Sequence, residues 1–402
     1  MKDLMEAMRE DGFYPDARAE GDKTEASPCG CGGQADDDVS CCGSKPAPTA
    51  GPDERPGYVL CGFVEGFLDT PAGRIPRVKT RMDREDLWGA LMARLGPGRD
   101  DYRVAPGLYC VGEPGETSPV LLSANYKLSF DALRKELAGR SAWILVLDTR
   151  GVNVWCAAGK KTFSTDEAVS RARASGLDRI APKAPLVIPQ LAATGVCART
   201  VGKRLGRKAV FGPIRARDLK AFLDGGLKAE AAMRRVTFSL AERAVLTPVE
   251  FYVARKQMLL AILAILLLSG LGAWGYSLGQ ALSRGAPLAL ALVCGLLAGT
   301  VATPLALPLL PGRALAVKGA LAGLLAGLAS LALYSPGLGF AEGGAALALA
   351  VAASSYGAMN FTGATPYCSP SGVEREMRRF IPLQAGAVLV AAVVWLGAAF
   401  VH

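Results

Sequence analysis

Short apolar runs alternate with amphipathic stretches from Gly57 to about residue 225 of this 402-residue chain. Four of the runs are continuous and rich in Val, Leu and Ile, which is typical of strands in a parallel sheet that is covered on both faces. The predicted strands are Pro119–Leu122, Trp143–Leu147, Leu186–Ile188 and Ala209–Phe211.

Helical patterns fill the segments between and after these strands. The predicted helices begin at Ser129, Ser164, Thr194 and Asp218 and end near Gly139, Gly176, Leu205 and Gly225. Ser164 has a particularly clear start signal, because Glu167 three residues later completes a capping-box pattern. Cys197 shares one face of the third helix with Val201 and is expected to be a small core residue. Strands alternating with helices predict an α/β, Rossmann-like, doubly wound domain.

Ligands of such sheets bind beyond the carboxyl ends of the strands. Three loops follow predicted strands there, at Gly151–Lys161, Pro189–Gly195 and Gly212–Ala216, and are expected to converge on one crevice. None of them carries the glycine pattern of a dinucleotide site or of a Walker phosphate loop. The crevice is therefore expected to take another kind of ligand.

The pattern changes after Lys256, where long apolar runs begin. They predict an all-α transmembrane domain over 251–402, with five spans at about 257–278, 287–303, 315–334, 342–359 and 381–401. The spans carry no charged residue near their centres, so they lack the usual mark of an ion pathway. Abundant Gly and Ala favour close helix packing. We expect a membrane anchor and docking bundle.

The basic loops predict the orientation of this bundle. With the first domain inside, the inner residues are Arg255, Lys256, Arg313, Lys318, Arg375, Arg378 and Arg379. Only Arg284 would lie in an outer loop. This pattern predicts a multi-pass protein of the cytoplasmic (inner) membrane, with a cytoplasmic N-terminal domain and the C-terminus outside. It also accounts for the net charge of +9. No basic run interleaved with aromatics appears, so we expect no nucleic-acid partner.

Ten cysteines do not suggest a disulfide framework, because the chain opens without a signal peptide and a reducing cytoplasm is expected. Four of them lie in the first 55 residues, a Cys-, Gly- and Pro-rich stretch that we expect to be a flexible tail before the α/β domain of residues 56–250. These four are Cys29, Cys31, Cys41 and Cys42. Two interpretations stay open: capture of a soft metal ion such as Hg²⁺, or a disordered tail with incidental thiols.

Cys156 is the best-placed thiol for chemistry. It follows a predicted strand, in the region where ligands bind, and the small residues Ala157–Gly159 would let a large flat ligand approach. Trp155 would close one side, and Lys160 would favour the thiolate. The alternative is an ordinary small hydrophobe in the core.

The stretch Asn153–Lys160 resembles the cap-helix signature of the HgcA family of mercury-methylating corrinoid proteins. Five further stretches are similar to the same family: Gly107–Tyr109, Ser118–Val120, Asn125–Asp131, Pro189–Leu191 and Gly212–Ala216. The resemblance covers about residues 57–402, because the family also has a five-span membrane tail. That family in turn resembles the corrinoid-binding part of the corrinoid iron–sulfur proteins of anaerobic one-carbon metabolism.

The resemblance implies a corrinoid (cobalamin-type) cofactor with the Cys156 thiolate as lower axial ligand of cobalt. Histidine, the commoner protein ligand, is excluded by the residues themselves, since the one histidine is His402. A thiolate is a strong electron donor to a metal. The activity implied is transfer of a methyl group from cobalt to Hg(II), which forms methylmercury.

The resemblance also implies further cofactor-binding residues. Around Cys156 they are Asn153, Val154, Trp155, Ala157, Ala158, Gly159 and Lys160. From the other loops they are Asn125, Gln190, Thr194, Gly195, Gly212, Pro213 and Arg215, which would bind or line the edge of the corrin ring. Thr194 has an alternative role as a plain helix cap, and Arg215 has one as a solvated residue.

The implied partners are a small ferredoxin with two [4Fe–4S] clusters as reductant, a methyl-folate-linked donor, a Hg(II)-thiolate substrate and membrane lipid. This chain contains no ferredoxin-type Cys-x₂-Cys-x₂-Cys run, so we expect no iron–sulfur cluster in it. Two alternative functions remain. One is a corrinoid methyl carrier of anaerobic one-carbon metabolism with another acceptor. The other is a transport protein with a soluble sensor domain, which the missing intramembrane charges disfavour.

Overall fold

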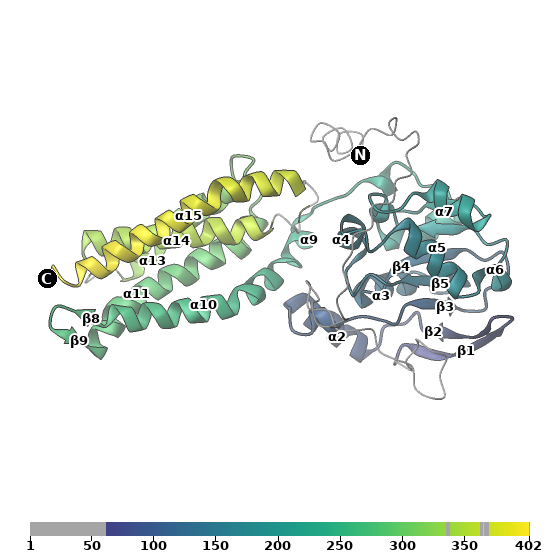
Figure 1. Ribbon diagram of the computed structural model, residues 1–402, viewed down its shortest axis with the longest axis horizontal. Coiled ribbons are helices and arrows are strands. Elements are labelled where there is room, and N and C mark those ends of the chain that lie inside the picture. Colours follow the sequence, from purple (N-terminus) through teal and green to yellow (C-terminus); the bar gives the residue numbers. More distant parts are fainter. Residues whose placement is uncertain (1–61, 335–337, 362–364, 366–369, 402) are drawn as a thin grey trace, which may run out of the picture. The chain divides into compact units, whose positions relative to one another are not determined.

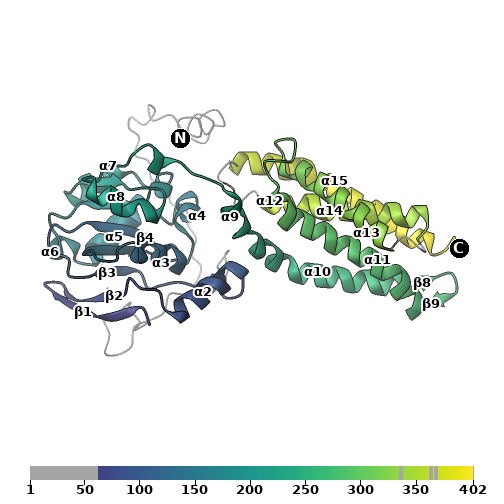
Figure 2. The same cartoon turned by 180° about the vertical axis from the view of Figure 1, so that it is seen from behind.

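The computed structural model describes residues 62–334, 338–361, 365 and 370–401. These residues form two compact units, whose main boundary lies between Val236 and Thr237 (Figures 1 and 2). The N-terminal stretch of residues 1–55, with its expected flexibility and its four clustered cysteines, lies outside the described residues.

The first unit is an α/β fold. Its strands are β1 (Val64–Thr70), β2 (Gly73–Val78), β3 (Gly107–Val111), β4 (Val120–Ala124), β5 (Ala142–Leu147), β6 (Leu186–Ile188) and β7 (Ala209–Phe211). Its helices are α2 (Arg84–Leu95), α3 (Lys127–Lys135), α4 (Val154–Gly159), α5 (Thr165–Ala174), α6 (Leu177–Ile180), α7 (Ala198–Leu205) and α8 (Leu219–Asp224). All four strands predicted from apolar runs are confirmed, as β4 to β7.

The strands form one seven-stranded mixed sheet in the order β1-β2-β3-β5-β4-β6-β7. The section β5-β4-β6-β7 is parallel, as a doubly wound fold requires, whereas β3 runs antiparallel to β5 and β1 antiparallel to β2. The Rossmann-like prediction is therefore confirmed for the α/β class, with the parallel part confined to β4–β7. The three strands before β4 complete the sheet as an edge extension.

Both faces of the parallel section are covered, because successive strand residues pack into different cores. On one face Leu122 and Leu145 pack with residues of α5 and α7, such as Val169 and Val201. On the other face Leu121 and Ile144 pack with residues of α3 and α8. Alternation along each strand accounts for the two layers, since side chains of a strand point to opposite faces. The continuous apolar runs are thus buried on both sides.

The connections reverse direction at β4. From β4 the chain passes through α3 to its neighbour β5, then crosses back through α4, α5 and α6 to β6 on the other side of β4. A ligand crevice forms at such a switch point, outside the carboxyl ends of the two central strands. For this sheet the expected crevice lies beyond Ala124 of β4 and Ile188 of β6.

Two predicted helix starts are wrong. Helix α3 begins at Lys127, before Ser129, and Tyr126 takes the cap position. Helix α7 begins at Ala198, after Thr194, and Cys197 takes the cap position. In both cases a Ser or Thr that resembles a cap lies near the start, but the surrounding fold decides where the helix begins. The predicted start of α5 at Ser164 is confirmed by a hydrogen bond from the Glu167 amide (3.2 Å).

A buried charge network joins α2 to α3. Lys127 Nζ donates to Asp86 Oδ1 (2.5 Å) and Asp131 Oδ2 (2.8 Å), and Arg134 donates to the other oxygens of the same two carboxylates (2.6 and 2.8 Å). Arg134 is fully buried. Burial opposes ionisation of Asp86, but hydrogen bonds and charge from Lys127 and Arg134 outweigh it and lower its pKa. Lys127 and Asp131, which lie in the Asn125–Asp131 stretch, thus help to join α3 to α2.

The second unit is helical. Its elements are α9 (Leu240–Ala244), α10 (Thr247–Ser269), a hairpin of β8 (Leu271–Gly272) and β9 (Gly275–Tyr276), α11 (Leu278–Leu297), α12 (Thr303–Leu305), α13 (Leu315–Tyr334), α14 (Phe340–Asn360) and α15 (Pro370–Ala398). A π-helical turn at Ala298–Ala302 continues α11. The long helices lie side by side in Figures 1 and 2.

Four described helical segments are long and apolar enough to cross a membrane: Leu240–Ser269, Leu278–Leu305, Leu315–Leu333 and Gly372–Ala398. This composition indicates a membrane protein. The expected span at 342–359 is a helix, α14, but it is not among the four. Helix α14 packs against α11, α13 and α15, so much of its surface faces protein. The predicted span 257–278 ends too late, because the β8–β9 hairpin follows Ser269.

Glycines allow the close packing of α14 that the composition suggests. A Cβ at Gly295 would clash with the Ala350 carbonyl, and one at Gly299 would clash with the Ser354 carbonyl. Small residues at such contacts let helix backbones approach closely in membranes. Gly295 and Gly299 therefore set the distance between α11 and α14.

Arg284 was expected in an outer loop and instead lies inside α11. Its Nε donates to Glu342 of α14 (2.8 Å), and its Nη2 donates to the Trp395 carbonyl of α15 (2.6 Å). The Trp395 indole N–H donates to Ser269 Oγ of α10 (2.9 Å). The hydrophobic pattern alone placed this charged residue in a loop. Only the folded structure shows the partners that let its charge lie inside the helical bundle. The cluster joins four helices near one end of the bundle.

We predict that Asp86→Asn lowers the free energy of unfolding by about 3–5 kcal/mol near neutral pH, because it leaves a buried cation with fewer partners. The pKa of Asp86 is lower in the folded protein than its usual value of about 3.9, so its stabilisation is complete above that value and is lost as pH falls through the folded-state pKa. Urea unfolding of the full chain in detergent between pH 7 and pH 3 measures both effects. Asp69→Asn, at an exposed carboxylate, is the control. Equal acid sensitivity of Asp86→Asn and the wild type would contradict the prediction.

Candidate functional site

A cavity of about 390 Å³ lies at the switch point of the sheet. Its walls come from the end of β4, the start of α3, the start of α4, and the loops after β6 and β7. The residues that line it include Leu122, Ser123, Ser129, Leu133, Asn153, Val154, Trp155, Pro189, Leu191, Gly212, Pro213, Ile214, Arg215 and Ala216. The three loops expected to converge beyond the strand ends therefore do so.

Helix α4 carries Cys156, which is not itself a lining residue but directly follows three residues that are, Asn153, Val154 and Trp155. Asn153 caps the helix, and its side-chain oxygen accepts a hydrogen bond from the Cys156 amide (3.0 Å). Ala157 and Ala158 are buried, whereas Cys156 is half-buried and a free thiol. The turn therefore fixes the backbone of Cys156 and leaves the residue partly exposed, next in sequence to three residues that line the cavity.

The side chain of Asn125 holds the loop that leads into α4. Its oxygen accepts hydrogen bonds from the Thr149 amide (3.1 Å), the Thr149 hydroxyl (2.8 Å) and the Gly151 amide (2.8 Å). Arg150 and Gly151 both have positive φ (56° and 74°), a tight turn that these bonds stabilise. Asn125 was expected to bind the cofactor directly, but its buried oxygen is committed to this turn. Its geometry suits a residue that positions α4.

A second contact holds the same loop from α5. Glu167 Oε1 accepts a hydrogen bond from the Asp148 amide (2.9 Å) and also pairs with Arg171 of the same helix (2.8 Å). The segment between β5 and α4 is thus fixed from two sides. A rigidly held loop is what a site needs if a single side chain must meet its ligand in one geometry.

The other expected site residues divide into two groups. Gly212, Pro213 and Arg215 line the cavity with Asn153, Val154 and Trp155. Those that do not line it are Asn125, Gln190, Thr194, Gly195, Ala157, Ala158, Gly159 and Lys160. The amide oxygen of Gln190 accepts a hydrogen bond from Arg234. Thr194 lies in the turn before Gly195.

Gly195 has a clear packing role. A Cβ there would lie 2.8 Å from the Ala158 carbonyl oxygen and 2.9 Å from Ala158 Cα, and would also clash with the Phe163 carbonyl. The loop after β6 can therefore rest directly on the end of α4. Gly195 helps to position the helix that carries Cys156.

The expectation that Cys197 is a core residue is wrong, because Cys197 is exposed at the start of α7. The Thr200 hydroxyl donates to its Sγ (3.2 Å), and this hydrogen bond lowers the pKa of the thiol. Burial raises the pKa of the Cys110 thiol to about 12, so that thiol stays protonated. Within the described residues no group of three or more His, Cys, Asp or Glu side chains could hold a metal ion.

Several cavity residues were missed by the sequence interpretation. Ser129 was assigned to a helix cap, and Leu191 and Ile214 were not singled out, yet all three line the cavity. Each lies inside one of the stretches that resemble the corrinoid family. The sequence therefore indicated the stretches that form the cavity, but not which of their side chains line it.

Residues 97–223 match the model of a family described as the CO dehydrogenase/acetyl-CoA synthase delta subunit. This segment includes β3 to β7 and every wall of the cavity. The expected resemblance to proteins of this kind is therefore confirmed for this part of the chain as a similarity to a CO dehydrogenase/acetyl-CoA synthase subunit.

Individual relatives point to the same system. A gamma 2 subunit of the acetyl-CoA decarbonylase/synthase complex from Methanosarcina thermophila is 31% identical over 123 residues, which are 29% of this chain and 25% of the relative. A gamma subunit from Archaeoglobus fulgidus is 27% identical over 31% of this chain and 27% of the relative. One from Methanopyrus kandleri is 41% identical over a shorter stretch, 14% of this chain and 13% of the relative. The chain spans about a quarter or less of the length of these relatives.

We predict that Gly195→Ala destabilises the protein by about 1–3 kcal/mol, because the added methyl group overpacks the contact with Ala158. Gly115→Ala is the matched control, since nothing lies within 4 Å of a Cβ at Gly115. Chemical unfolding of both variants of the full chain in detergent measures the difference. Equal effects at the two glycines would show that the contact with α4 is not tight.

Proposed function

We propose that the cavity beside α4 receives one side of a corrinoid and that the Cys156 thiolate is the lower axial ligand of its cobalt. The observation that carries this proposal is the placement of Cys156. A half-buried free thiol stands on a capped turn beside the switch-point cavity, within the segment that matches the acetyl-CoA synthase subunit family. The single histidine, His402, is the last residue, so sulfur is the strong donor at hand.

The residues present fit such a group. The volume of about 390 Å³ lies within the range of ligand pockets, and it suits one part of a large flat ring. Gly212 and Pro213 line one side of the cavity, and their small side chains leave room for a ring. Ser129, Asn153 and Arg215 bring polar groups to the same cavity, where the ring's amide side chains would need partners. Cys156 directly follows the lining residues Asn153, Val154 and Trp155 in the chain.

We propose that the chain uses this group to methylate Hg(II). When bound, the corrinoid supplies a cobalt atom that carries the methyl group and releases it to an acceptor. Cys156 would donate electron density to the metal, as a cysteine ligand does to haem iron. The hydrogen bond from the Cys156 amide to Asn153 fixes the backbone from which this donor extends. The acceptor Hg(II) gives up one thiolate ligand as it takes the methyl group.

The remaining parts of the proposal concern partners and place. A small ferredoxin with two [4Fe–4S] clusters would supply electrons, and a methyl-folate-linked system would supply the methyl group. The similarity to subunits of a multi-protein complex supports work with such partners. We propose that the first unit faces the cytoplasm, which the basic residues between the apolar helices support.

A second candidate function is that of a corrinoid methyl carrier with another acceptor. The relatives favour it, because those named above are subunits of acetyl-CoA decarbonylase/synthase complexes. An assay that offers both isotopically labelled Hg(II)-thiolate and other methyl acceptors to the anaerobically purified protein separates the two functions. The absorption spectrum of the same sample tests both, because a protein that binds no added corrinoid can perform neither.

We predict that Cys156→Ala lowers methylmercury formation by more than about 100-fold, because loss of the ligand should exceed the 10–100-fold loss typical of its supporting residues. Cys156→His should still bind corrinoid, with an altered absorption spectrum and weaker methyl transfer. Cys197→Ala, at an exposed thiol outside the cavity, is the control and should keep its rate within about twofold. A normal rate for Cys156→Ala would remove the axial-ligand proposal.

A further inference from the structure

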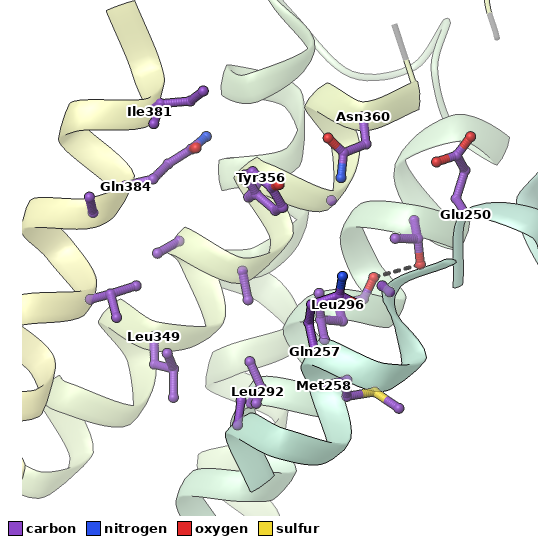
Figure 3. Close-up of a pocket in the computed structure, with 18 of the residues that line it drawn as sticks. Glu250, Gln257, Met258, Leu292, Leu296, Leu349, Tyr356, Asn360, Ile381 and Gln384 are labelled. Carbon is purple, nitrogen blue, oxygen red and sulfur yellow. Dashed lines mark hydrogen bonds between the residues drawn. The ribbon is translucent and has the colours of Figure 1, made fainter. Parts of the chain in front are cut away.

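Two cavities of this protein are built in different ways. The groove of about 730 Å³ in the helical unit has walls from α10, α11, α14 and α15 (Figure 3). The switch-point cavity instead has two walls made of loops, one after β6 with Pro189 and Leu191, and one after β7 with residues 212–216. Loop backbones are held less firmly than helices and strands, so such walls need support from other parts of the fold.

A short segment that follows α8 returns to these loops. Leu227 turns the chain with a positive φ of 64°, a conformation that residues other than glycine rarely adopt. The Leu227 amide donates to the Phe222 carbonyl (3.0 Å), which secures the turn. Leu227 packs on the core that contains Phe222, and Met233 is buried in that core. We call residues 227–235 the strap, and they belong to the compact sheet unit.

The strap holds the loop after β7 through its backbone. The amide of Ile214, a residue that lines the cavity, donates to the Met233 carbonyl (3.0 Å). The Met233 side chain is 9% exposed and packs in the core that α3 and α8 share with the sheet. Because this side chain is anchored, its carbonyl stays in place as the acceptor for the cavity wall.

The strap holds the loop after β6 through a side chain. Arg234 Nη1 donates to the side-chain oxygen of Gln190, which lies between the lining residues Pro189 and Leu191 in the chain. The donor is a guanidinium group, so this is a charge-assisted hydrogen bond, one of the stronger kinds. One short segment therefore supports both loop walls of the cavity.

The loop after β6 also supports helix α4. Its 3₁₀ turn η2 (Gln190–Ala192) packs against α4, and Gly195 lies close to the Ala158 carbonyl at the end of the same helix. A shift of η2 therefore changes the support of the helix that carries Cys156. Arg234 is not among the residues that line the cavity, so its influence on the site passes through Gln190.

We propose that the strap sets the shape of the switch-point cavity and that Arg234 is a positioning residue for the ligand bound there. Without the Arg234 hydrogen bond, the wall after β6 gains freedom, and a ligand that orders it again binds less tightly. The strap is also the last part of the sheet unit before the boundary at Thr237, so the segment through which the chain leaves this unit fixes the site. The effect on a corrinoid rests on the proposed function, whereas the effect on the loops does not.

Hydrogen–deuterium exchange of the full chain in detergent, without ligand, tests the strap directly. Arg234→Ala should speed exchange in peptides from residues 190–196 by about tenfold, the scale of one hydrogen bond to a charged group. Arg234→Lys keeps a cationic donor and should restore most of the protection. Arg235→Ala, at an exposed arginine of the same segment, is the matched control and should stay within about twofold of the wild type. If Arg234→Ala fails to fold, Gln190→Met removes the acceptor and gives the same readout.

Titration of the same variants with methylcobalamin measures the effect on the site. The methyl group fills the upper position of cobalt, so the absorption spectrum reports the lower ligand. Arg234→Ala should weaken binding by about tenfold and lower the sulfur-ligated share of the bound cofactor, and Arg234→Lys should recover both. A loss of stability alone would leave the spectrum of the bound fraction unchanged.

The two measurements separate this proposal from the proposed function. A wild type that binds no methylcobalamin would remove the corrinoid function, and the exchange data would still decide about the strap. Exchange that is unchanged in both Arg234→Ala and Gln190→Met, or equal in Arg234→Ala and Arg235→Ala, would overturn the strap proposal. Loosened loops with an unchanged affinity for methylcobalamin would overturn the positioning role of Arg234.

Discussion

Strand β4 lies between β5 and β6, so the chain must cross back over the sheet after β5 to continue at β6. This reversal separates the loops on the two sides of β4 and opens a space between them. Asn153, Pro189 and Gly212 meet around the cavity only because their strands end at the same edge. Apolar cores on both faces keep the parallel strands in place. The candidate chemistry of Cys156 depends on this topology.

Buried polar groups and close packing then fix the position of α4 relative to the sheet. Asn125 and Glu167 fix the turn before α4 from separate elements, and Gly195 lets the loop after β6 rest on the end of α4. Asp86 and its partners join α2 to α3 in the same way. Each of these contacts satisfies its buried donors or acceptors.

The hydrophobic pattern along the chain predicted those strands and helices whose formation depends on neighbouring residues in the sequence. Strands β4 to β7 were identifiable because continuous apolar runs signal strands buried on both faces. Strands β1 and β2 are only partly buried and were not predicted from the pattern. The starts of α3 and α7 were misplaced because several polar residues near each start resemble caps. Helix α14 was expected to span the membrane, and its position among α11, α13 and α15 explains how it is accommodated with a less apolar sequence.

The amino-acid sequence by itself determined the α/β class, the apolar helical region and the loop that carries Cys156, because hydrophobic period and chain order are local properties. The tertiary structure decided which side chains serve the cavity and which support it. Asn125 was expected to bind a ligand, but its oxygen meets Thr149 and Gly151, more than twenty residues away. Arg284 was expected in a loop, but it pairs with Glu342 of another helix. Such roles depend on groups that meet only after folding, so no local pattern encodes them.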